Sequence, residues 1–208
     1  MIHRASSSIQ LVLLAVAASF LSGCGTNDEW MPMKVHRRWT YRVRAGFERH
    51  TVPITVSREI TVASTTGFEL ASPLGVSRLA WKSGHLVAES MVNARFIPPI
   101  PLLVPDLNLD KTHLKSMKPW HGRIDVSGIE RPAEATLEEQ NDTVDLGTRK
   151  VPTILTILTV TLPAVEPPNP LPPAVLELKS WFQAGVGLVQ QEQRTHKDRI
   201  VQLTLVGR

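Results

Sequence analysis

Residues 39–47, WTYRVRAGF, alternate apolar and polar side chains with a period of two. Such alternation places an apolar row and a solvent-facing row on a β-strand, because successive side chains point to opposite faces. The pattern returns in residues 52–62, where Arg58 falls on the apolar side. We expect Arg58 to lie at a strand end or a sheet opening, or to reach solvent past its neighbours.

Signals for further short strands continue along the chain, separated by turn signals such as Ser83-Gly84. Residues 151–162 are rich in β-branched side chains, which is typical of a central strand. The other predicted strands cover residues 67–72, 76–82, 85–92, 120–129, 133–140, 175–182, 186–194 and 199–206. The sequence therefore predicts an all-β fold with little helix: a strongly curved antiparallel sheet that forms a half-barrel or a part-closed barrel.

Two proline-rich stretches interrupt the strand pattern, at residues 93–119 and 163–173. Proline lacks the backbone N–H that helix interiors and central strands require, so both stretches are predicted to be long loops. Residues 106–118 could contain one short helical turn. The first loop is apolar and could cap the open end of the barrel, or act as a lid or a loop that contacts lipid or a partner. The candidate residues are Phe96, Ile97, Ile100, Leu102 and Leu103.

The N-terminus has the order of a secretory signal peptide: a short charged segment, an apolar core and then small residues. Arg4 supplies the charge, residues 11–18 are apolar without interruption, and Ser22 and Gly23 precede Cys24. The apolar core is shorter than the roughly 20 residues that a membrane-spanning helix needs. We therefore expect this segment to direct export and then to be removed.

Leu21-Ser22-Gly23-Cys24 resembles the lipobox of bacterial lipoproteins. The resemblance implies cleavage between Gly23 and Cys24, a diacylglyceryl group on the Cys24 thiol, and commonly acylation of the new amine. Cys24 is the only cysteine of the chain, and lipidation would occupy a thiol that otherwise stays free in an oxidising compartment. The alternative is an ordinary secretory signal with an incidental cysteine.

The lipobox resemblance also implies a place and an organisation for the protein. Acyl chains on Cys24 would anchor it to a lipid bilayer of the bacterial cell envelope. In enteric bacteria, an Asp after the lipidated cysteine favours the inner membrane, so Gly25 favours the outer membrane here. We predict a signal peptide at residues 1–23, a lipidated N-terminus and tether at 24–35, and a single β-rich domain at 36–208.

A second resemblance lies near the C-terminus, in the stretch WFQAGVGLVQQE at residues 181–192. It resembles a signature of uncharacterised envelope proteins, W-[FY]-x-x-G-[VI]-G-[LM]-V-[KR]-x-E, which is accompanied by a Val-Pro turn and a W-x-Y strand, here Val151-Pro152 and Trp39-Thr40-Tyr41. Gln190 departs from this pattern, and so does Thr153-Ile154, where the pattern has Gly-x-Phe. The resemblance implies a fold similar to the LolA/LolB-like half-barrel, whose concave apolar face can hold acyl chains.

Charge and motif content argue against several function classes. The chain has 23 basic and 19 acidic residues, and removing residues 1–23 takes away Arg4 alone, so the mature charge is 22 − 19 = +3. This small excess does not indicate nucleic-acid binding. A basic group near the tether is either a solvated face or a contact for anionic lipid head groups. The group consists of Lys34, Arg37, Arg38, Arg42 and Arg44.

Catalytic and metal-binding patterns are also missing from the sequence. The histidines do not stand at metal-ligand spacing, and no G-x-S-x-G motif occurs. Glu138 and Glu139 are adjacent, so on a strand they face opposite ways and cannot act as an acid/base pair. We therefore predict no cofactor, no metal and no enzymatic activity.

Two functional hypotheses remain for the β-domain. In the first, its curved sheet binds an apolar small molecule or acyl chain. In the second, it is a structural or protein-interaction component of the envelope with a filled core. An open apolar cavity would favour the first hypothesis, and bulky side chains that meet across the sheet would favour the second.

Overall fold

The computed structural model describes residues 27–92, 94–105, 109, 112–147, 149–165, 170–195 and 200–207. Most of the described chain is β-strand, with one short 3-10 helix before the first strand. The elements are η2 (Asn27–Trp30), β1 (Arg38–Ala45), β2 (Glu48–Val62), β3 (Thr65–Ser72), β4 (Gly75–Lys82), β5 (His85–Met91), β6 (Ala94–Leu103), β7 (Lys115–Ser116), β8 (Trp120–Val126), β9 (Ile129–Asp145), β10 (Lys150–Leu162), β11 (Ala174–Gln183), β12 (Gly187–Thr195) and β13 (Ile200–Gly207).

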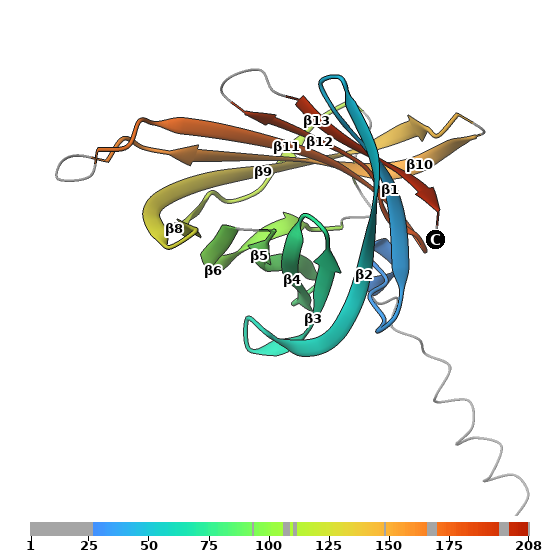
Figure 1. The fold of residues 1–208 in the computed structure, drawn as a ribbon, viewed down its shortest axis with the longest axis horizontal. Coiled ribbons are helices and arrows are strands. Elements are labelled where there is room, and N and C mark those ends of the chain that lie inside the picture. Colours follow the sequence, from blue (N-terminus) through green and yellow to red (C-terminus); the bar gives the residue numbers. More distant parts are fainter. Residues whose placement is uncertain are drawn as a thin grey trace, which may run out of the picture.

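Twelve of these strands form a closed antiparallel barrel. Each pairs with the next along the chain, β13 pairs back with β1, and the short β7 pairs only with β9. Figure 1 shows that the barrel is flattened: β9–β13 form one layer, β3–β6 form the other, and β2 and the β8–β9 turn curve between them. The predicted curved antiparallel fold is confirmed, and its closure goes further than a half-barrel. Among the described residues, closure gives each of the twelve strands a partner on both sides.

Strand β1 illustrates why the sequence pattern produces this barrel. Trp39, Tyr41 and Val43 are at most 2% exposed and face the interior. Arg42 precedes Val43 and Arg44 follows it, and both arginines are exposed. The same division along the other strands builds one main core between the two layers. The period-two prediction for residues 39–47 is therefore confirmed as far as Ala45, where β1 ends.

Arg58 reaches the outer surface through an irregularity in β2. The pairing of β2 with β3 shifts register between Val56 and Arg58, which turns the arginine outwards. Its side chain is 62% exposed, and its Nη2 lies 2.8 Å from Oε2 of Glu69 on β3. The hydrogen bond from Arg58 holds the pKa of Glu69 below its ordinary value. The residue that breaks the apolar pattern thus marks a β-bulge.

The loop predicted for residues 93–119 is wrong over its first part, because Ala94–Leu103 form strand β6. β6 pairs with β8 only from Ala94 to Ile97, and its prolines follow that segment. The missing backbone N–H groups of these prolines are tolerated because β6 no longer forms hydrogen bonds with β8 beyond Ile97. Four of the five candidate lid residues are at most 8% exposed and belong to the core, so they do not form an exposed lid; only Ile97 is exposed, at 40%. The four are Phe96, Ile100, Leu102 and Leu103.

The remaining loop predictions have mixed outcomes. Residues 112–114 are not helical, and Lys115–Ser116 form β7 in place of the predicted helical turn, whose other residues at 106–108, 110 and 111 lie outside the described part. The second proline segment has no regular strand over residues 163–165 and 170–173, and one isolated bridge joins Val165 and Leu171. No described helix has the length and apolar character required to cross a membrane.

The predicted tether is shorter than expected. Met31 is 5% exposed and belongs to the main core. The backbone N–H of Gly185 donates to the carbonyl oxygen of Glu29 at 2.7 Å, and Trp81 Nε1 donates to the carbonyl oxygen of Met31 at 3.3 Å. The folded domain therefore begins before residue 36, because residues 29–31 are held against the barrel.

Gly122 on β8 lies so close to the backbone of Ile97 and to the Trp120 ring that a larger residue would not fit. A Cβ at this position would lie 2.5 Å from the carbonyl oxygen of Ile97 and would also overlap the Trp120 ring. We expect Gly122→Ala to lower the free energy of unfolding by about 1–3 kcal/mol, the usual cost of overpacking. Urea unfolding of the two proteins measures this difference.

Gly207→Ala provides the matched control for Gly122→Ala. A Cβ at Gly207 would make only an ordinary contact of 3.7 Å with Thr40. Its stability should stay within about 0.5 kcal/mol of the parent protein. Equal unfolding midpoints for the two alanine variants would contradict the close packing of β6 against β8.

Candidate ligand cavity

A cavity of about 190 Å³ lies inside the barrel, between the two layers seen in Figure 1. Its walls come from both layers and from β1 and β2, and Met31 contributes from the N-terminal segment. Most of the lining is apolar, and its large side chains include Trp39, Leu86, Leu158 and Phe182. The inward positions of the alternating strands therefore enclose space as well as forming a core.

No charged side chain and no histidine lines this cavity within the described residues. Among the same described residues, no group of three or more His, Cys, Asp or Glu side chains could hold a metal ion. The cavity wall thus offers hydrophobic contact and neutral hydrogen-bonding groups.

Three of the neutral polar lining residues form a row across three strands. Thr156 on β10 pairs with Ser180 on β11, and Ser180 pairs with Gln191 on β12. Thr156 is 1% exposed and Ser180 is 4% exposed. Gln191 Nε2 donates a hydrogen bond to Ser180 Oγ at 3.1 Å. We call these three residues the polar row; their hydroxyl and amide groups can hydrogen-bond a neutral oxygen or nitrogen atom of a ligand.

Tyr41 fixes another part of the wall. Its hydroxyl donates to the carbonyl oxygen of Leu188 at 2.8 Å, which ties β1 to β12 across the interior. Burial raises the pKa of Tyr41 well above its ordinary value, so the phenol remains neutral at any physiological pH. Tyr41 therefore adds no charge to the cavity.

Two exposed side chains line the cavity at one pair of turns. Leu74 in the β3–β4 turn and Val92 in the β5–β6 turn are each 42% exposed, and we infer that the cavity opens beside them. The other described lining residues are less exposed. An apolar molecule could enter between these two side chains.

The C-terminal signature has a structural role at the side of the cavity. Gly185 and Gly187 have φ angles of 73° and 104°, which favour glycine, and they form the turn between β11 and β12. Trp39 Nε1 donates to the carbonyl oxygen of Val186 at 2.8 Å. Trp181 is 9% exposed and belongs to a second hydrophobic cluster, separate from the main core, and its Nε1 donates to Asp142 Oδ2 at 2.8 Å.

The candidate residues from sequence have different outcomes. Gly23 and Cys24 lie outside the described residues, so cleavage and lipidation stay predictions. Of the five lid candidates, only Leu102 lines the cavity. Sequence reasoning missed the polar row, although Thr156 and Ser180 occupy inward positions beside Leu158 and Phe182. A polar residue at an inward strand position was the signal that could have found it.

No protein-family model matches the sequence, and no curated protein matches it. Solved structures do resemble the barrel. A candidate lipoprotein from Parabacteroides distasonis is 12% identical with a TM-score of 0.53, over 85% of this chain and 96% of that one. A candidate exported protein with a YmcC-like fold from Bacteroides fragilis is 13% identical with a TM-score of 0.48, over 83% and 94% of the two chains.

The hypothetical lipoprotein YmcC from Escherichia coli is 14% identical with a TM-score of 0.39, over 99% of this chain and 98% of that one. At these identities, the similarity to the Parabacteroides protein shows a shared fold. The barrel is therefore an architecture that a solved structure also contains.

Proposed function

We propose that this protein is a lipoprotein of the bacterial cell envelope whose barrel binds a small neutral apolar ligand or one segment of an acyl chain. The cavity of about 190 Å³ is the observation that supports binding. The resemblance of residues 21–24 to a lipobox supports anchoring through Cys24, and Gly25 favours the outer membrane. The role is binding without catalysis, and its partners are the bilayer and the apolar ligand.

The size of the cavity limits the ligand. Sites for drug-sized molecules usually measure about 300–1,000 Å³, whereas an apolar cavity of about 150 Å³ holds a molecule the size of benzene. At about 190 Å³, the cavity therefore suits a small molecule or part of a longer chain. A longer chain would leave through the opening beside Leu74 and Val92.

The lining also limits the charge of the ligand. Moving a carboxylate or ammonium group into an apolar site without a partner is strongly unfavourable. The described lining contains no charged side chain to compensate such a group. A hydrocarbon, an ester or an alcohol fits better, with its oxygen at the polar row of Thr156, Ser180 and Gln191.

Leu188→Trp tests the binding proposal because this half-buried leucine lines the cavity. We expect the larger side chain to fill the space and to remove bound ligand. Residues 25–208, produced without the anchor and purified from cells, would be measured by native mass spectrometry. The parent protein should carry an added apolar mass that Leu188→Trp lacks.

Leu176→Trp is the matched control, because Leu176 is also a half-buried leucine of the barrel but does not line the cavity. It should keep the ligand. Parent protein without any bound apolar mass, or equal loss in both variants, would argue against binding.

The second candidate function is a structural or protein-interaction lipoprotein without a ligand. The tight packing around the cavity favours it: Trp39, Leu86, Ile100 and Leu103 have no exposed surface and fill much of the interior. Parent protein that is free of ligand in the same mass spectrum would support this second candidate.

A further inference from the structure

The basic group predicted from the sequence divides into two parts in the structure. Arg37 is held by the barrel: its Nη2 donates to the carbonyl oxygen of Gly185 at 3.1 Å, and its guanidinium lies 5.4 Å from the centre of the Trp39 ring. Arg42 and Arg44 lie further along β1 and face outwards, where Arg49 of β2 joins them. We call Arg42, Arg44 and Arg49 the arginine cluster.

Two members of the arginine cluster stand directly opposite each other. Arg44 on β1 pairs with Arg49 on β2 in the antiparallel ladder. Side chains at such positions start about 4.5–5.5 Å apart, and like charges directly opposite destabilise a sheet. Arg44 and Arg49 therefore repel each other on the outer surface, close to the β1–β2 turn.

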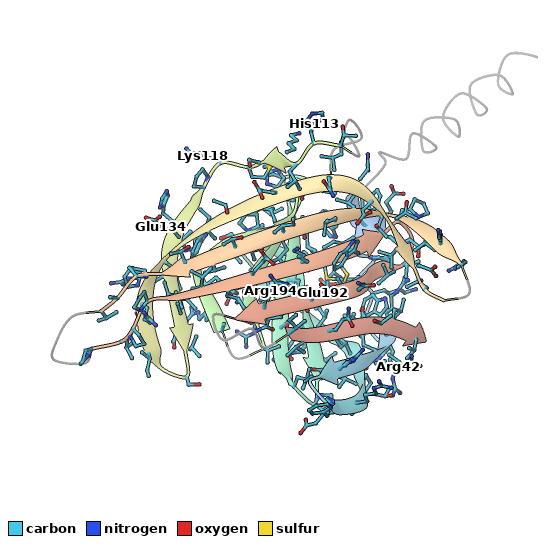
Figure 2. All side chains as sticks on the ribbon, turned by 90° about the horizontal axis from the view of Figure 1, so that it is seen from above. Arg42, His113, Lys118, Glu134, Glu192 and Arg194 are labelled. Carbon is cyan, nitrogen blue, oxygen red and sulfur yellow. The ribbon has the colours of Figure 1, made fainter. Side chains whose placement is uncertain are left out.

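The arginine cluster borders a cleft of about 240 Å³, and the cleft is completed by Gln202 and Thr204 of β13. Gln202 pairs with Arg44 and Thr204 pairs with Arg42, so polar groups flank the guanidinium groups on the β13 side. Figure 2 shows Arg42 on this side of the barrel, with Glu192 and Arg194 on the neighbouring β12. Guanidinium, amide and hydroxyl donors therefore converge on one concave surface.

Three exposed arginines of the barrel have acidic partners, whereas the arginine cluster has none among the described residues. Arg58 and Arg78 lie near Glu69, and Arg123 Nη1 lies 3.0 Å from Glu130 Oε1. Within the described part of the chain, Arg42, Arg44 and Arg49 form no ion pair.

Two carboxylates lie nearby, on the rim of an adjoining hollow. Glu48 and Glu192 border that hollow together with Arg44. Glu192 Oε1 already accepts a hydrogen bond from Gln202 Nε2 at 2.7 Å and another from Gln190 Nε2 at 3.4 Å. Neither glutamate lines the cleft itself, whose wall consists of three cationic and two neutral polar side chains.

We propose that the arginine cluster, with Gln202 and Thr204, is a binding site for a phosphate group. A tetrahedral dianion can accept parallel hydrogen bonds from two guanidinium forks, which is the geometry that makes arginine effective in phosphate recognition. A phosphate between Arg44 and Arg49 would also remove their mutual repulsion. The group could belong to free phosphate or to a phospholipid head group, because both present non-bridging phosphate oxygens; a head-group phosphodiester has two of them and one negative charge.

Isothermal titration calorimetry of the detergent-solubilised full-length protein tests this site. Inorganic phosphate is the first probe, and glycerophosphoglycerol, the soluble head group of phosphatidylglycerol, is the second. We expect the double variant Arg44→Gln/Arg49→Gln to weaken binding at least about tenfold, since charge-assisted hydrogen bonds are lost. Binding should also weaken as salt concentration rises, because the site is exposed.

The double variant Arg78→Gln/Arg123→Gln is the control, because it removes the same number of charges from ion-paired positions. It should bind within about twofold of the parent protein, since neither arginine lines the cleft. Thermal unfolding separates binding from folding. Without anion, Arg44→Gln/Arg49→Gln should be at least as stable as the parent, because a like-charge pair has been removed.

The two probes distinguish the sources of the phosphate group. Binding of inorganic phosphate that depends on Arg44 and Arg49 supports a free phosphate ligand. Dependent binding of glycerophosphoglycerol alone supports a lipid head group. Failure of both probes to bind, or equal weakening in the two double variants, overturns the proposal. None of these outcomes depends on the interior cavity, so the site can fail while the proposed ligand function holds.

Discussion

Cys24→Ser is expected to abolish membrane anchoring of this protein. A serine hydroxyl cannot form the thioether that attaches diacylglycerol, and cleavage before residue 24 depends on that lipid. Each buried methylene contributes about 0.8 kcal/mol, so two or three acyl chains hold a protein stably where one chain is marginal. Labelling cells with radioactive palmitate and separating membrane from soluble fractions would measure both consequences.

The expected outcome for Cys24→Ser is loss of the label together with unprocessed or soluble protein. Ser22→Ala is the control, because it keeps a small residue in the lipobox-like stretch and should be labelled and anchored normally. Unchanged anchoring of Cys24→Ser would show that Cys24 is incidental and that the N-terminal segment is an ordinary secretory signal.

Trp39→Ala should have the largest effect on folding among the core substitutions considered, lowering the free energy of unfolding by about 3–5 kcal/mol. Trp39 has no exposed surface, and it joins β1 to the β11–β12 turn through its hydrogen bond to the carbonyl oxygen of Val186. Truncation would leave a cavity and a carbonyl group without this donor. The stacked Arg37 would lose its contact as well.

Two further variants divide this effect into its causes. Trp39→Phe keeps an aromatic ring but removes the hydrogen bond to Val186, so it should cost about 1–3 kcal/mol. Phe47→Ala removes an aromatic side chain that is fully exposed and should change stability by less than about 0.5 kcal/mol. Urea unfolding of the three variants would show the order. A Trp39→Ala midpoint as high as that of Phe47→Ala would contradict the central position of this residue.

Much of the fold could be predicted from the sequence, because alternation depends on local geometry. The pattern of residues 39–47 became β1, and Ser83 and Gly84 form a turn with φ angles of 50° and 81°. Closure of the barrel could not be predicted in this way. It requires β1 to pair with β13, more than 150 residues later in the chain, and no local pattern encodes such a partner.

The errors have physical reasons of their own. The prolines predict a loop at residues 94–103, but the effect of a missing backbone N–H depends on whether a neighbouring strand needs it as a hydrogen-bond donor. The cavity depends on how side chains from opposite layers meet, which the alternation of a single strand does not determine. Arg49 lies on the next strand, and only the register between β1 and β2 places it beside Arg42 and Arg44. The sequence pattern therefore does not group the three arginines.

The pairing of β13 with β1 also has a consequence for how the chain folds. Synthesis delivers the N-terminal strand first, yet β1 lacks its second neighbour until residues 200–207 have followed. During that interval β1 and β12 expose unpaired backbone, which makes them vulnerable to proteases and to pairing with other chains. Formation of the complete ring is a late, long-range event, and such contacts slow folding. A chaperone that shields β1 would therefore be most useful before the last strand arrives.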